Sequence, residues 1–233
     1  MKAFLALVGK EQRALFLSPV AYVVAAVFLV LLGYTFTTFL FINKVATLLN
    51  VFFQTAVLLL LLVPVLTMRL LAEERRLGTL ETLLTAPVTE AAIVGAKFLA
   101  AWTLVLAMLA ATAVYAVVLG LHGTPDWGPI YSGYLGLVLL AAALVAMGLL
   151  VSSLTASQLV AAVLSLGVFL LLWMIDTLSY LVPDPVDSLL LNLSLLAHFT
   201  PFATGSLFLS DVGFFLSLAA AALFLSVRAL ARR

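Results

Sequence analysis

The sequence contains no cysteine, only two histidines and very little charge. Without cysteine, the chain forms no disulfide, no thiolate metal site and no thiol nucleophile. Charged residues make up 9% of the 233 residues, whereas soluble domains contain about 25%. Apolar residues make up 66%, against about 45–50% in soluble domains. These departures from the soluble average indicate an integral membrane protein.

Motifs of enzymes and nucleotide sites are also missing. No G-x-x-x-x-G-K-[ST] loop is present, and Lys97, in the stretch 94–98, lacks the spacing of a phosphate-binding loop. No H-E-x-x-H or G-x-S-x-G motif occurs, and His122 and His198 are far apart without further metal ligands. We therefore expect no catalytic residue, metal or cofactor. The net charge of +1 gives no sign of a nucleic-acid partner.

Long apolar stretches predict an all-α membrane protein. A helix needs about 20 residues to cross the hydrocarbon core, and the chain has room for six such helices in one domain over residues 1–233. The basic start lacks a small-residue cleavage site, which favours a retained helix over a signal peptide. The six expected spans cover residues 20–42, 51–71, 91–120, 132–152, 158–181 and 211–228.

The basic residues predict the orientation. If the N-terminus is cytoplasmic, all but one of the 11 Lys and Arg residues lie on the inner side, and only Lys44 lies outside. The inner residues are Lys2, Lys10, Arg13, Arg69, Arg75, Arg76, Lys97, Arg228, Arg232 and Arg233. By the positive-inside rule, both termini are cytoplasmic.

Residues 1–18 are too charged to span a membrane, but they form an amphipathic pattern. One helical face is apolar: Phe4, Leu7, Val8 and Leu15. Lys10 and Arg13 lie opposite, which predicts an interfacial helix along the membrane that ends at Ser18-Pro19. Glu11 falls inside the apolar sector, so we expect it to pair with a basic group or a partner protein. The alternative is that its carboxylate reaches sideways to solvent.

The charged segment at 72–90, between the second and third spans, carries both signs. Gly78 is placed to end one helical piece, and Thr79 to cap a second, whose leucines recur at i, i+3 and i+4 before Pro87. This predicts a short amphipathic helix on the inner membrane face that offers polar groups to a cytoplasmic partner. A solvated loop that only sets orientation is the alternative.

A second segment, at 182–210, contains turn signals around an apolar stretch that is too short to cross. The stretch 189–199 lies between Pro183-Asp184-Pro185 and Thr200-Pro201. It predicts helices that enter the outer leaflet and return before the sixth span.

At the level of motifs, the chain resembles the membrane subunits of ABC-2 type ABC transporters, nearest to the gliding-motility type of permease. The stretch from Glu73 to Glu81, followed by Pro87, is similar to that family's E-x-x-x-G-T-x-E-x-L-x-x-x-P signature. Supporting matches are Lys10-Glu11, Ser18-Pro19, Ser152-Ser153-Leu154-Thr155 and Trp173-Met174-Ile175-Asp176.

The resemblance implies an exporter subunit of the inner membrane that pairs with a second permease, identical or different, and binds two copies of a separate ATPase. The segment at 72–90 would be the coupling helix and residues 1–18 an elbow helix near the ATPase. The resemblance leaves open whether a periplasmic accessory subunit joins the complex. The implied docking residues are Glu73, Glu74, Arg75, Arg76, Gly78, Thr79, Glu81 and Pro87, with Lys10, Glu11 and Arg13 in the elbow.

Two other classes fit parts of the sequence. A membrane scaffold or mechanical anchor, in an ATPase-driven complex without solute transport, would have the same pattern. A channel or ion-coupled carrier needs charged groups at mid-depth, and these spans have almost none. Asp176 falls near the outer boundary of the fifth span, too far from mid-membrane for a proton relay.

Overall fold

The computed structural model describes residues 2–43, 45–79, 88–179 and 186–231, and every regular element in these ranges is a helix. The helices are α1 (Lys2–Phe16), α2 (Pro19–Asn43), α3 (Leu49–Thr67), α4 (Ala72–Leu77), α6 (Glu90–His122), α7 (Trp127–Leu154), α8 (Gln158–Ser179), α9 (Val186–Leu193), α10 (Leu195–Thr204) and α11 (Leu209–Ala231).

Six segments are long and apolar enough to cross a membrane, which confirms the predicted number. They are α2, α3 continuing through α4 to Leu77, α6, α7, α8 and α11. The break at Ser18-Pro19 is also confirmed, because α1 ends at Phe16 and Pro19 is the first residue of α2. Proline suits this position since its missing N–H has no partner within the first turn of a helix.

The fourth span begins earlier than expected, at Trp127 instead of residue 132. The Asp126 carboxylate accepts a hydrogen bond from the Gly128 backbone N–H at 3.0 Å and so caps the new helix. Pro129 then lies in the first turn, where no backbone N–H is needed. Residues 127–131, which lie before the predicted span, therefore belong to α7.

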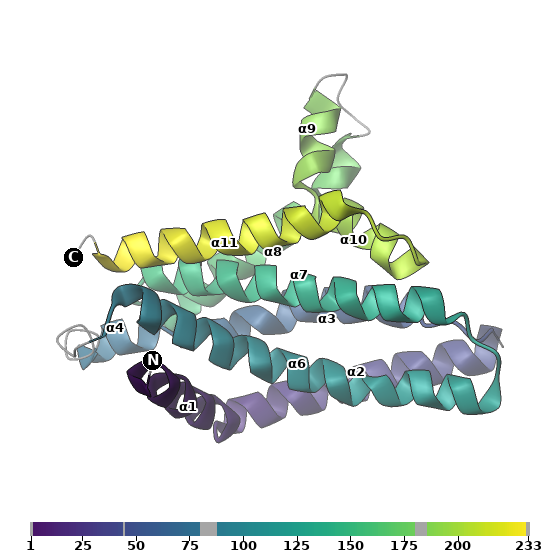
Figure 1. The fold of residues 1–233 in the computed structure, drawn as a ribbon, viewed down its shortest axis with the longest axis horizontal. Coiled ribbons are helices and arrows are strands. Elements are labelled where there is room, and N and C mark those ends of the chain that lie inside the picture. Colours follow the sequence, from purple (N-terminus) through teal and green to yellow (C-terminus); the bar gives the residue numbers. More distant parts are fainter. Residues whose placement is uncertain (1, 44, 80–87, 180–185, 232–233) are drawn as a thin grey trace.

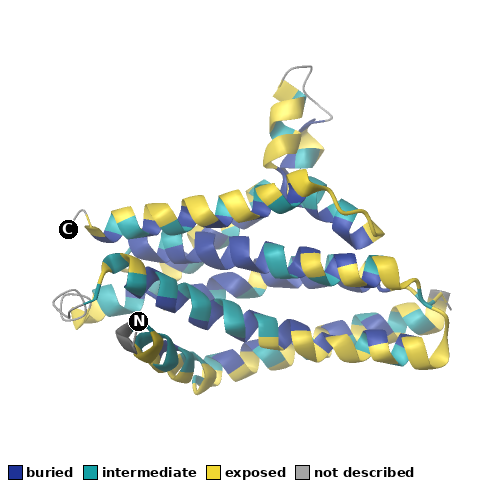
Figure 2. Ribbon diagram, viewed as in Figure 1, coloured by how far each residue is buried: buried dark blue, intermediate teal, exposed yellow. Residues whose placement is uncertain are grey.

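Both chain termini lie at one end of the bundle (Figure 1), as an even number of crossings requires. We call this end, which also carries α4, the terminal end, and the opposite end the distal end. The buried faces converge on α7 and α3, whereas α2, α8 and α11 present exposed apolar faces to the surroundings (Figure 2). Such faces are expected of helices in contact with lipid.

Helix α7 packs closely against its neighbours because it carries glycine at three contact points. A Cβ atom on Gly133 would lie 2.3 Å from the Phe52 ring of α3, and one on Gly136 would lie 2.5 Å from Cβ of Phe202 in α10. A Cβ atom on Gly148 would lie 2.3 Å from the Thr67 hydroxyl. Small residues of this kind allow helix backbones to approach within a membrane bundle.

The helices α9 and α10 form a pair bent by 63° between α8 and α11, and α9 projects from the bundle (Figure 1). Helix α8 runs toward the distal end and α11 runs back from it to the terminal end. The pair lies between these two spans, and its bend fits either a broken span or a re-entrant element. The re-entrant path of 182–210 stays a prediction, and residues 180–185 lie outside the described ranges.

Candidate functional site

The short helix α4 concentrates charge at the terminal end. Glu73 and Glu74 occupy its first turn, and Arg75 and Arg76 its last, which is the arrangement that the helix dipole favours. The helix ends at Gly78, whose φ of 71° lies in the left-handed region that glycine adopts without strain. The predicted stop at Gly78 is therefore confirmed.

A buried ammonium group connects α4 to two other helices. Lys97 of α6 is only 2% exposed, and its Nζ donates to Glu11 Oε2 of α1 at 3.1 Å and to Glu74 Oε1 of α4 at 2.6 Å. Glu11 is 7% exposed, and its other oxygen lies 3.7 Å from the exposed Lys10 ammonium. The expectation that Glu11 pairs with a basic group is thus correct, and its carboxylate does not reach sideways to solvent. We call Glu11, Lys97 and Glu74 the ion cluster.

The ion cluster fixes the relative positions of α1, α4 and α6. A buried charge is costly unless it is paired and hydrogen-bonded, so Lys97 requires its carboxylate partners. Two carboxylates share one ammonium, and Glu74 Oε2 is buried without a hydrogen-bond partner among the described residues. A displacement of α4 therefore strains contacts that α1 and α6 also depend on.

A second contact connects α4 to α7. The Ser152 hydroxyl of α7 accepts hydrogen bonds from the backbone N–H groups of Leu71 at 3.1 Å and Ala72 at 3.0 Å. It also lies 3.2 Å from the Met68 carbonyl, to which it donates. Helices usually receive their N-terminal cap from a neighbouring residue in sequence, but here the cap for α4 comes from another span. One turn before Ser152, Gly148 gives α7 its close approach to the end of α3.

Helix α1 lies against the first part of α6 at three points. Phe4 packs 3.6 Å from the position of a Cβ atom on Gly95, Glu11 pairs with Lys97, and Gln12 Nε2 donates to the Thr103 hydroxyl at 3.2 Å. Leu5 of α1 and Leu17, which follows the helix, remain exposed. The placement of α1 along the membrane surface stays a prediction.

A cavity of about 330 Å³ opens beside the ion cluster. Its polar lining comes from all three cluster residues and from Arg69, Glu73 and Ser18. The cavity is bordered by four exposed residues: Arg76, Leu77, Gly78 and Thr79. The terminal end thus offers an exposed basic group and partly exposed acidic groups on a helix whose internal contacts lead to α1, α6 and α7.

The structure brings some of the predicted docking residues together and separates others. Glu11 and Glu74 meet at Lys97, and Lys10 adjoins Glu11. Arg13 and Arg76 form no ion pair with another described residue. The Thr79 hydroxyl donates to the Glu74 carbonyl at 3.3 Å, so it contacts the helix that ends before it. Glu81, Pro87 and the amphipathic helix expected between them lie outside the described residues.

Sequence reasoning missed the roles of Lys97 and Ser152. We considered Lys97 as a failed phosphate-binding lysine and as one of the inner basic residues, but not as an ion-pair partner, although it is the one Lys or Arg within the 33 residues of α6. A lone charge inside an apolar span is costly and predicts a buried partner, so this signal was available. Ser152 carried no comparable signal, because hydroxyls are common in membrane helices.

Buried hydroxyls inside the spans bond mainly to carbonyls of their own helices. Thr55 donates to Val51 O at 2.6 Å, and Ser226 donates to Ala222 O at 2.7 Å. Within the described ranges, no group of three His, Asp or Glu residues is placed to hold a metal ion. Buried charge in these ranges is limited to Glu11, Lys97 and Asp211, all on α1 or near the start of a span.

Comparison with known proteins identifies a family. The family model described as "ABC-2 family transporter protein" matches residues 5–231, nearly the whole chain. No curated protein matched the sequence. The family match does not distinguish the gliding-motility type from other members, so that nearer resemblance stays a prediction.

Proposed function

The chain belongs to the ABC-2 family of transporter proteins, a family of membrane permease subunits, and we propose that it serves an exporter driven by a separate ATPase that docks on α4. Multiple apolar spans agree with such a subunit. The observation that carries the proposal is the ion cluster, because it connects an exposed charged helix to two parts of the bundle.

The proposed docking surface combines α4 with the outer side of α1. Arg76, Gly78 and Thr79 are exposed, and Glu73, Glu74 and Arg75 are partly exposed, so their charges are accessible to a partner. Lys10 and Arg13 are exposed on α1, the proposed elbow helix. With Glu81 and Pro87 from the segment outside the described residues, this surface contains every docking residue that the family signature implies.

Force applied to α4 has two routes into the bundle. Lys97 transmits a displacement to α6 and α1, and Ser152 transmits it to α7. Because packed helices move as rigid bodies, closure of the ATPase would rock the membrane domain instead of bending α4 alone. This supports an ATP-driven motion without a nucleotide site on the chain itself.

The assembly follows from the family and the charge distribution. We propose an inner-membrane location with both termini cytoplasmic, because the basic residues cluster toward the terminal end. A second permease subunit, identical or different, would complete the transport path, and an accessory subunit would bind the distal end. In this proposal the chain is not an enzyme, and it needs no metal, cofactor or nucleic acid.

The other function classes receive less support. An ion-coupled carrier needs ionisable groups along its path, whereas the buried charges of the described residues lie on α1 or near the start of a span. A scaffold without transport would present the same α4 to an ATPase. Solute transport by the purified complex separates the scaffold from the exporter.

The test is to purify the tagged chain from its native membrane in mild detergent and identify its partners by mass spectrometry. We expect a stoichiometric protein with a phosphate-binding loop, and ATPase activity in the eluate. Recovery of the chain alone, under conditions that preserve its assembly, would contradict the proposal.

The docking surface is tested most cleanly at Arg76, which is exposed and forms no ion pair with another described residue. Glu74→Lys would be ambiguous, since it also places a second ammonium beside Lys97. We expect Arg76→Glu to reduce ATPase co-purification while the chain still inserts and folds. Thr124→Glu, which adds a carboxylate to an exposed turn at the distal end, should leave co-purification unchanged.

A further inference from the structure

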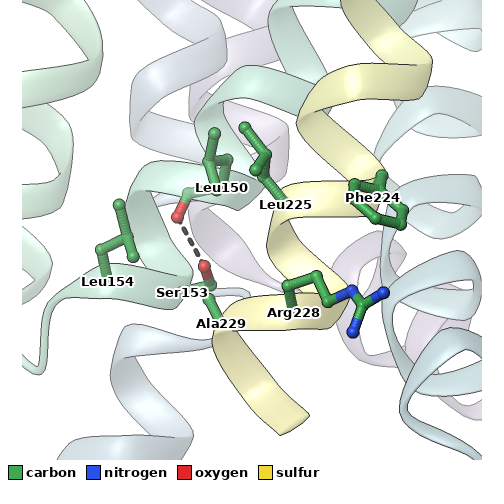
Figure 3. A pocket seen from close by; sticks show the side chains of 7 residues that line it. All are labelled: Leu150, Ser153, Leu154, Phe224, Leu225, Arg228 and Ala229. Atoms are coloured by element: carbon green, nitrogen blue, oxygen red, sulfur yellow. Dashed lines mark hydrogen bonds between the residues drawn. The ribbon is translucent and has the colours of Figure 1, made fainter. Parts of the chain in front are cut away.

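An open groove lies between α7 and α11 (Figure 3), where both helices end on the side of the terminal end (Figure 1). Its volume is about 680 Å³. Leu150 and Leu154 come from α7, and Phe224 and Leu225 come from α11. Ser153 also lines it, but its hydroxyl donates to the Leu150 carbonyl at 2.6 Å, so this donor is already used. The walls are therefore suited to a hydrocarbon chain.

Arg228 is the only charged residue that lines this groove among those that the structure describes. It is exposed, and no described carboxylate forms an ion pair with it. Its guanidinium carbon lies 5.1 Å from the centre of the Phe224 ring, a cation–π contact that limits its movement. The groove thus combines apolar walls with one held positive charge that lacks an anion.

The depth of Arg228 corresponds to a membrane boundary. From Leu209, at the distal end of α11, to Arg228 the helix rises roughly 28 Å at 1.5 Å per residue, close to the hydrocarbon thickness of about 30 Å. A headgroup at this boundary would meet the guanidinium, and its acyl chain would extend along Leu225 and Leu150. Arg232 and Arg233 follow in the sequence and add positive charge.

We propose that the groove between α7 and α11 binds a phospholipid with a net negative headgroup, with its phosphate on Arg228 and one acyl chain between the helices. A second groove provides an internal comparison. It has a volume of about 760 Å³ at the distal end, between α2 and α6, and no Lys or Arg among the described residues lines it. Both grooves accept a chain, but only the first distinguishes an anionic headgroup.

The test uses native mass spectrometry of the purified full chain in detergent, titrated with phosphatidylglycerol or phosphatidylcholine that carry identical acyl chains. We expect a bound lipid with preference for phosphatidylglycerol. Arg228→Gln should reduce that preference about fivefold, the effect of one basic residue at a membrane surface. Arg76→Gln removes the same charge outside the groove and should not change it.

A second pair of variants tests the groove itself. Ala229 lines the groove, and Ala229→Trp should fill it and remove the lipid that prefers phosphatidylglycerol. Val45→Trp fills the distal groove and should leave that lipid bound.

Two results would overturn the proposal. One is an undiminished preference for phosphatidylglycerol in Arg228→Gln or Ala229→Trp. The other is a wild-type dimer without bound lipid that Ala229→Trp dissociates, which would assign the groove to a second copy of the chain. Neither result bears on ATPase docking, which uses α4.

Discussion

The two ends of the bundle are held together by different forces. At the terminal end, α4 is joined to α1, α6 and α7. The contacts are the charge-assisted hydrogen bonds of Lys97 and the hydroxyl hydrogen bonds of Ser152. At the distal end, the described residues contain no ion pair, and aromatic contacts dominate. These include Phe52 with Tyr134 at 5.3 Å, Phe53 with Phe199 at 5.8 Å and His198 with Phe214 at 3.9 Å between ring centres.

The contacts at the two ends differ in how strongly their energy depends on the exact positions of the helices. Aromatic packing tolerates small shifts, because dispersion changes gradually with position and no single atom pair dominates. A buried ammonium between two carboxylates tolerates little displacement, since separating the charges leaves each one unpaired. The end that we propose to receive the ATPase is thus the end where small displacements of a helix have large energetic effects.

Removal of the ammonium should have the largest effect. Lys97→Met leaves the buried Glu11 carboxylate and the partly exposed Glu74 carboxylate without their shared cation, and we expect a loss of about 3–5 kcal/mol in the free energy of unfolding. The measurement is an SDS titration of the chain in mild detergent, followed by tryptophan fluorescence.

The matched control neutralises the whole ion cluster. Glu11→Gln and Glu74→Gln, added to Lys97→Met, remove all three charges, and replacement of a complete buried ion pair is often close to neutral. We therefore expect the triple variant to regain most of the lost stability. If Lys97→Met alone stays within about 1 kcal/mol of the wild type, the ion cluster does not hold the terminal end together.

A packing change at the distal end should have a smaller effect. Gly136→Ala places a Cβ atom 2.5 Å from the Phe202 side chain, so α7 and α10 must separate, at a cost of about 1–3 kcal/mol. Gly167→Ala in α8 meets no atom within 4 Å and should be neutral or slightly stabilising, because alanine favours the helix. Equal effects of the two variants in the same SDS titration would contradict the proposed close approach.

The sequence predicted most of the fold because its strongest signals are local. Apolar length defined the spans, Pro19 the start of α2, and Gly78 the end of α4. The predicted start of α7 was wrong because the prediction did not include the cap that Asp126 provides. Each of these features depends on a few neighbouring residues.

Contacts between distant residues could be predicted only in part. Glu11 was expected to have a basic partner, yet nothing local identifies Lys97, which lies 86 residues away. The cap of α4 is even harder to predict from the sequence. Ser152 lies 80 residues from Ala72, and a serine in a span has many alternative roles. Tertiary packing, not local pattern, decides which hydroxyl meets which backbone donor.

Two serines of α7 provide the finest comparison between the ends. Ser152 accepts from two backbone N–H groups at the start of α4, whereas Ser132 donates to the Phe202 carbonyl at 2.8 Å and lies near two carbonyls of its own helix. Buried N–H groups without partners are rarer, and so costlier, than carbonyls that lose one of two hydrogen bonds. Ser152→Ala should thus cost about 1–2 kcal/mol, as loss of a helix cap does.

Ser132→Ala should cost only about 0.5 kcal/mol, the lower limit for a single hydrogen bond, because its carbonyl partners keep other donors. Both variants remove one hydroxyl from a buried site on the same helix, so the cost of the cavity largely cancels in the comparison. Hydrogen exchange of the Leu71 and Ala72 amides should accelerate in Ser152→Ala and stay unchanged in Ser132→Ala. Equal unfolding free energies with equal exchange would mean that α4 does not depend on Ser152 for its first turn, and the ion pair between Glu74 and Lys97 would then contribute more to the attachment of α4.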